Sequence, residues 1–252
     1  MVDLLLQRKT CYDPDLASRV NAERIVERVT PVVPASRVTS DDLQWYEGIV
    51  VEQMSLLVAD GRVPLSFADI LRKRLDSLGT AEEKEWWDRE IHSGDAAFYH
   101  PDGRMVIVYD SEIMRGINLN SRLENGVLVI DEYIFNQLRG VAFTREEFRK
   151  YAMSKMLSKD EFLANPFWRI LARDDGLLEE YADAALMRVT EYRYGIIRGV
   201  YENYGEVPRG RLLGIGNTDS NVSAPDWAIQ YLIDANPINH LVGMTLKAHK
   251  NT

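Results

Sequence analysis

Carboxylates stand at the ends of two apolar runs in the middle of the sequence. The run VIVYDSE places Asp110 and Glu112 two residues apart, so both lie on one face if the chain is extended there. The run VLVIDEY places Asp131 directly after a second apolar segment. If the two runs are neighbouring strands, the three carboxylates can meet and hold a divalent ion that activates water. This pattern is consistent with a metal-dependent, nuclease-like hydrolase, although no lysine follows at the spacing of nuclease signatures.

His100 is the histidine that can complete such a site, because it precedes a Pro-Asp-Gly turn and would lie on the partner strand. The ligands of Mg²⁺ or Mn²⁺ would then be Asp110, Glu112, Asp131 and His100. A simpler interpretation is that Asp131 caps the helix after it and that Asp110 and Glu112 are solvated strand-end charges. We favour that interpretation, in which the protein has no cofactor and is not an enzyme.

The longest predicted helix covers residues 177–204 and is apolar over more than half of its circumference. Gly195 and Gly199 lie on one strip of it, and each costs about 1 kcal/mol relative to alanine in a helix interior. Tyr192 and Tyr201 belong to its two apolar flanks. A helix of this kind is buried on two sides, so we expect a packing seam within the domain or against a partner chain.

Phe167 and Trp168 form a dense apolar turn in the segment NPFWRIL, which begins a helix at Pro166. The short connection to the next helix predicts that these aromatic side chains pack against Leu178 or Tyr181. The alternative is that Phe167 and Trp168 are exposed and anchor a partner protein.

The predicted fold class is α+β, predominantly helical, with a small, mostly antiparallel sheet and one long central helix at 177–204. The N-terminal part is predicted to be helical and includes a helix from about residue 40 to Gly61. We expect one compact unit, whose parts are a helical region at 1–93 with an extended segment at 30–38, and an α+β region at 94–252 with a hairpin at 96–110, a strand at 126–130 and a C-terminal strand.

Composition limits the classes of function. The chain has 252 residues with 30 Lys+Arg and 39 Asp+Glu, so its formal charge is −9, which makes nucleic acid an improbable partner. Cys11 is the only cysteine, which fits a reducing, cytoplasmic compartment. No apolar run approaches the length of a membrane span, so we expect a soluble protein. The function expected is that of a non-enzymatic subunit of a homo-oligomer or protein complex, and such a subunit could belong to a viral or phage assembly.

Overall fold

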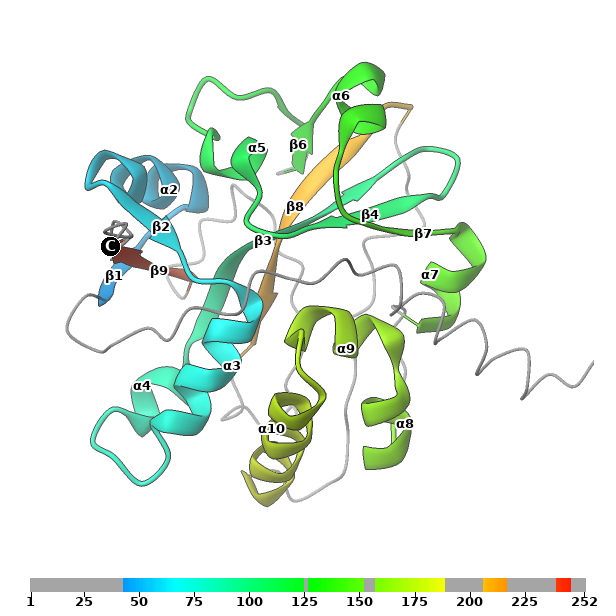
Figure 1. The fold of residues 1–252 in the computed structure, drawn as a ribbon. Helices are drawn as coiled ribbons and strands as arrows, with labels where there is room; N and C mark the ends of the chain where they lie inside the picture. Colours follow the sequence, from blue (N-terminus) through cyan, green and yellow to red (C-terminus); the bar gives the residue numbers. More distant parts are fainter. Residues whose placement is uncertain (1–42, 125–126, 152–156, 189–205, 217–238, 246–252) are drawn as a thin grey trace, which may run out of the picture.

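The computed structural model describes residues 43–124, 127–151, 157–188, 206–216 and 239–245. Nine strands in these residues form one mixed sheet (Figure 1). The strands are β1 (Leu43–Glu47), β2 (Arg62–Pro64), β3 (Glu90–Tyr99), β4 (Met105–Val108), β5 (Leu123–Glu124), β6 (Val127–Val129), β7 (Val141–Phe143), β8 (Arg209–Ile215) and β9 (Asn239–Thr245).

The sheet brings the first and last described strands together. Its order is β1-β9-β3-β8-β6-β5, with β2 beside β9 and with β4 between β3 and β7. Strand β1 pairs antiparallel with β9, so that Leu43 lies opposite Met244. Strand β9 is parallel to β3, whereas the β3–β8 and β3–β4 pairs are antiparallel. The long strand β3 is therefore hydrogen-bonded to three different segments of the chain.

Helices cover the sheet on both faces (Figure 1). They are α2 (Val50–Ala59), α3 (Phe67–Asp76), α4 (Glu83–Asp88), α5 (Glu112–Arg115), α6 (Glu132–Gln137), α7 (Arg145–Tyr151), α8 (Lys159–Ala164), α9 (Pro166–Ala172) and α10 (Asp175–Arg188). No helix in the described ranges is long and apolar enough to cross a bilayer.

Two hydrophobic cores lie on opposite faces of the sheet. Alternate residues of β3 enter different cores, since Ala97 belongs to the core with α3, α9 and α10, and Phe98 to the core with α2, α5 and α6. Leu212 and Leu213 of β8 divide in the same way. This alternation is the two-residue period of a strand whose faces are both covered.

Local signals in the sequence begin several helices as expected. Ser66 and Ser158 each form a capping box with the residue three positions later, and Asn165 caps α9, which has Pro166 in its first turn. The predicted hairpin is confirmed by the pairing of β3 with β4, which the turn at Gly103 joins at φ 94°. Strand β6 lies within the predicted range 126–130, and β9 is a C-terminal strand such as the sequence predicted.

The predicted fold class is wrong in its proportions. The molecule is not predominantly helical with a small sheet, because nine strands of the described part form one mixed sheet with a hydrophobic core on each face. The helix expected from residue 40 to Gly61 is interrupted as well: residues 43–47 form β1, and α2 begins at Val50. Gly48 separates the two elements at φ 125°, a conformation that glycine adopts and other residues avoid.

The long helix predicted at 177–204 is described only in part. Helix α10 begins at Asp175 and is described to Arg188. Residues 189–204, with the glycine pair of the proposed seam, lie outside the described part of the chain, as does the extended segment predicted at 30–38.

Candidate functional site

The carboxylates predicted to bind a metal do not converge. The Asp110 carboxylate lies beside Arg115, with 3.7 Å between Oδ1 and Nε, and Glu112 lies 3.7 Å from the same guanidinium. Asp131 is exposed at the N-cap position of α6, where its side chain makes no capping hydrogen bond. In the described ranges no cluster of three or more His, Cys, Asp or Glu side chains is arranged to hold a metal ion. The side chains of the alternative Mg²⁺ or Mn²⁺ site are therefore not gathered into a metal-binding group among the described residues.

His100 contacts two carboxylates other than those expected. Its Nε2 lies 2.7 Å from Oε2 of Glu132, the first residue of α6. Its Nδ1 lies 2.8 Å from Oδ1 of Asp102 in the β3–β4 turn. Arg104 donates from Nε to the other oxygen of Asp102 at 2.6 Å, and the Phe135 ring centroid is 5.0 Å from the imidazole centroid. The imidazole therefore connects the hairpin turn to α6.

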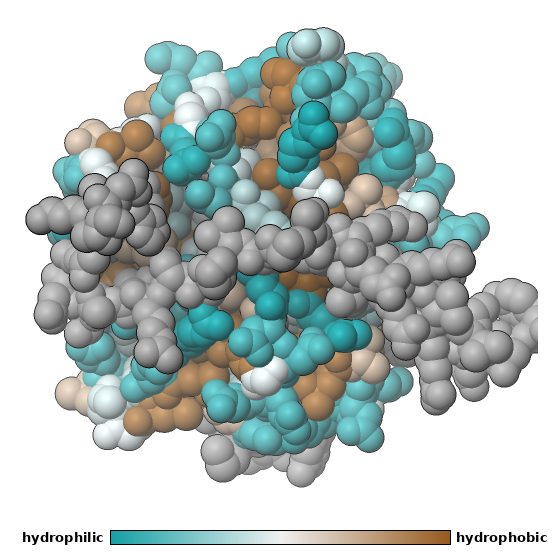
Figure 2. Space-filling model, in the orientation of Figure 1, coloured by the Kyte–Doolittle hydropathy of each residue, from teal (hydrophilic) through white to brown (hydrophobic). Residues whose placement is uncertain are grey.

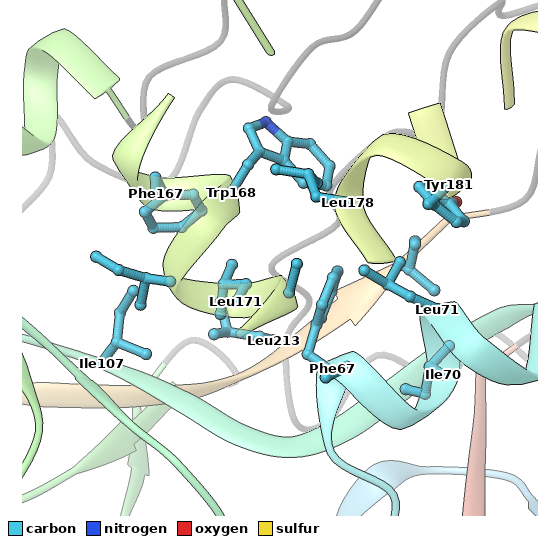
Figure 3. Close-up of a cluster of buried hydrophobic side chains, with 14 of the residues drawn as sticks. Phe67, Ile70, Leu71, Ile107, Phe167, Trp168, Leu171, Leu178, Tyr181 and Leu213 are labelled. Atoms are coloured by element: carbon cyan, nitrogen blue, oxygen red, sulfur yellow. The ribbon is translucent and has the colours of Figure 1, made fainter. Parts of the chain in front are cut away.

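The aromatic pair after Pro166 is buried. Phe167 and Trp168 have no exposed surface and belong to one core cluster with Leu178 and Tyr181. Figure 3 shows Trp168 beside Leu178. The predicted packing of this turn against the following helix is confirmed, and the interpretation as exposed anchors is wrong. The other proposed interface residues lie outside the described residues; they are Tyr192, Gly195, Gly199 and Tyr201.

Asp95 is a fully buried carboxylate that the sequence analysis missed. Its Oδ2 accepts a hydrogen bond from the backbone N–H of Phe67 at 2.9 Å. Its Oδ1 accepts from the backbone N–H of Asp110 at 2.9 Å and from Arg173 at 2.6 Å. Asp95 thereby joins the start of α3, the turn after β4 and the end of α9. We call Asp95 and its three partners, Phe67, Asp110 and Arg173, the Asp95 hub.

The Asp95 hub also contains two residues of the described part whose backbone conformation is strained. Arg173 at φ 60° and Asp110 at φ 45° are the non-glycine residues with positive φ there, and both bond to Asp95. Such strain persists where surrounding contacts determine the conformation. Burial raises the pKa of Asp110, while the guanidinium of Arg115 opposes that shift. Because Asp95 has no solvent contact, its carboxylate binds the chain to itself and is closed to a ligand.

An exposed surface with a different character lies on α6. Tyr133 is 76% exposed and Ile134 is 37% exposed, whereas Phe135 of the same helix is buried. Asp131 precedes the helix and Arg139 follows it, and both are exposed. We call the surface formed by Asp131, Tyr133, Ile134 and Arg139 the α6 rim. In Figure 2 hydrophobic surface emerges among hydrophilic side chains at the top of the view, where Figure 1 places β6 and α6.

Sequence signals for both features exist. The α6 rim follows from the run EYIFNQL, in which three large side chains are consecutive in a short helix. Consecutive helical residues are 100° apart, so a helix lying on a surface cannot bury all three. Asp95 stands between Gly94 and a run of apolar residues, which marks a charge within a strand but does not indicate its partner.

Comparisons with known proteins assign the fold. No protein-family profile matches the chain, and no curated protein matches it. A solved structure described as "Accommodation of massive sequence variation in Nanoarchaeota by the C-type lectin fold" is similar, with a TM-score of 0.56 and 13% sequence identity. The match covers 83% of this chain and 99% of that chain. The chain is similar in fold to this C-type lectin structure. At this identity the likeness concerns the fold alone. Helix α6 lies on the side of the sheet that also carries α2 and α5 (Figure 1).

Proposed function

We propose that the protein is a non-enzymatic subunit that forms a two-fold symmetric homodimer through the α6 rim. The observation that carries the proposal is the 76% exposure of Tyr133 on helix α6, whose Phe135 is buried in the core beneath the helix. Tyrosine is enriched at the centres of protein interfaces because its large ring buries much apolar area at a low cost in side-chain entropy. Ile134 extends the apolar surface beside it.

The charges at the two ends of α6 make this surface self-complementary. Asp131 and Arg139 form no ion pair in the part of the chain that the structure describes. Helix α6, which lies between them, has six residues and is about 9 Å long. If a second copy places its α6 antiparallel across a two-fold axis, Asp131 of each copy faces Arg139 of the other. The tyrosines then lie between the two ion pairs, as an isologous interface requires.

The wider surroundings can supply the area that a stable interface needs. A specific interface buries on the order of 800 Å² on each partner, which is more than a helix of six residues offers. The loop after α5 lies on the same upper side of the molecule in Figure 1, and Leu119 in it is 68% exposed. The described relative of this fold is said to accommodate massive sequence variation, which favours a scaffold whose exposed side chains select the partner.

Sedimentation equilibrium of charge-swap variants tests the proposal. The wild type should have a mass above the 28.9 kDa of one chain at high micromolar concentration. Asp131→Arg and Arg139→Asp should each dissociate the dimer, because each places like charges in contact across the axis. The double variant should restore association, since both ion pairs then form with the signs exchanged.

Tyr133→Asp should also give a monomer, whereas Leu56→Asp on α2 is the matched control. Leu56 is 59% exposed and lies outside the α6 rim, so its substitution should leave association unchanged. A wild type that remains a monomer would refute the proposal. Dissociation by Leu56→Asp, or a double charge swap that stays monomeric, would show that the α6 rim is not the interface.

A further inference from the structure

We propose that His100 is a proton-operated latch that fixes α6, and with it the α6 rim, to the β3–β4 turn. Its effect on dimerisation rests on the proposed function, but the latch itself can be measured in a monomer. The proposal follows from the two sides of one imidazole ring, each of which faces a carboxylate from a different element.

The protonation state of the ring determines whether it can donate a hydrogen bond to both carboxylates. Nε2 lies 2.7 Å from Glu132 and Nδ1 lies 2.8 Å from Asp102. A neutral imidazole has one N–H and can donate to one of them, whereas the protonated ring donates to both. The backbone N–H of Asp102 is 3.2 Å from Nδ1 and provides the neutral ring with a donor. Nδ1 thus has a carboxylate partner when it carries a proton and a backbone partner when it does not.

The surroundings of the ring favour a switch over a permanent ion pair. The charged groups on the elements packed around it are Asp102 and Arg104 of the turn, Glu132 of α6, and Arg145 of α7. The Arg104 guanidinium already bonds to Asp102, and Arg145 packs its methylenes against Gly103 in the same turn. The Arg104 cation offsets part of the negative charge around the ring. The His100 side chain is 13% exposed and can exchange its proton with water.

Both carboxylates around the ring have pKa values below the ordinary ones. The hydrogen bond from His100 lowers the pKa of Glu132. Burial raises the pKa of Asp102, but its hydrogen bonds from Arg104 and the imidazole outweigh burial and the net direction is downward. Imidazole is the side chain that ordinarily changes charge near pH 6.5. Protonation of the ring therefore leaves its two carboxylate partners ionised.

The latch is complete when the ring is protonated, and it loses one carboxylate contact when the ring is neutral. Charge-assisted hydrogen bonds are about twice as strong as neutral ones, so the hold on Glu132 also weakens when the ring loses its charge. Helix α6 then remains attached through Phe135, with more freedom at its N-terminal end. We expect the homodimer to be tighter at acidic pH, by about fivefold or more, a common size for coupling between two sites.

The first measurement uses NMR of the ring and the backbone amides in the Tyr133→Asp monomer. The α6 amide shifts should follow pH with the same midpoint as the His100 ring, and His100→Gln should abolish that dependence. In the same background, Asp102→Asn and Glu132→Gln should each lower the midpoint of the ring titration. Amides of α6 that ignore the ring titration, or a midpoint that neither variant moves, would overturn the latch.

The second measurement is the dimer dissociation constant as a function of pH. In the wild type this constant should rise from acidic to mildly alkaline pH, and in His100→Gln it should depend less on pH. The variant is the control for the general effect of net charge on dissociation. Equal slopes in the two proteins would overturn the coupling. A wild type that never dimerises would refute the proposed function, while the monomer titration would still decide the latch.

Discussion

Replacing Asp95 by asparagine should destabilise the protein strongly while preserving the shape of the side chain. Asp95 accepts hydrogen bonds on both oxygens, from Arg173 at 2.6 Å and from two backbone N–H groups at 2.9 Å. Asparagine can keep its oxygen on the Arg173 side. Its NH₂ group then faces the N–H of Phe67, so two donors oppose each other and the buried guanidinium loses its counter-charge.

The expected loss is about 3–5 kcal/mol, the cost of removing one partner from a buried ion pair. An unfolding free energy of about 5–15 kcal/mol can absorb that loss, so the variant should still fold. Asp95→Ala leaves all three donors without an acceptor and should cost more, because each orphaned buried donor adds about 1–3 kcal/mol.

Urea unfolding followed by circular dichroism measures these differences. Asp183→Asn is the matched control, since Asp183 forms an exposed ion pair with Lys159 and should cost less than about 1 kcal/mol. Arg173→Met and the double variant complete a double-mutant cycle, whose coupling energy should exceed about 1 kcal/mol for contacting residues. An Asp95→Asn variant as stable as the control, or a cycle with no coupling, would refute the reasoning.

Three further substitutions test the structure through the free energy of unfolding or through the change of that free energy with pH. Trp168→Ala should cost about 3–5 kcal/mol of unfolding free energy, because it empties a core position with no exposed surface; a smaller loss together with weaker association would contradict the core assignment. Burial, aided by Arg89, lowers the pKa of His240 below its ordinary 6.5, so the native state binds fewer protons than the unfolded chain and stability should fall as pH drops below 6.5. His240→Gln should remove that part of the acid sensitivity in urea titrations. Burial and the hydrogen bond to Asp60 raise the pKa of Tyr46 from 10.0 to about 12, so stability should fall as pH rises from 10 toward 12, and Tyr46→Phe should remove this alkaline loss.

The features that the sequence predicted correctly depend on residues close together in the chain. The helix caps at Ser66 and Ser158 join residues three positions apart. The turn of the β3–β4 hairpin needs only the Pro-Asp-Gly segment around Gly103. The burial of Trp168 follows from its place in an apolar turn beside the next helix. In each case the interacting groups are neighbours in sequence, so their types and spacing suffice.

Strand β1 shows where local pattern misleads. The spacing of Leu43, Tyr46 and Val50 is that of a helical stripe, yet the first two residues lie in a strand and the third begins α2. The apolar side chains fit both conformations. Antiparallel pairing with β9 decides between them, because it satisfies the backbone hydrogen bonds of residues 43–47 from a segment near the other end of the chain.

The first half of β3 and the Asp95 hub depend on tertiary structure in the same way. The segment EIHSGDAA has polar and small residues in place of the β-branched run that predicts a strand. Its backbone is extended because β8 and β9 bond to it, and Asp95 is tolerated in the core because Arg173, 78 residues away, supplies a counter-charge. Composition and spacing determined the caps, the turn and the apolar positions. The partner of each strand and buried charge was decided by the folded chain, since a hydrogen bond or ion pair between distant segments leaves no periodicity in either of them.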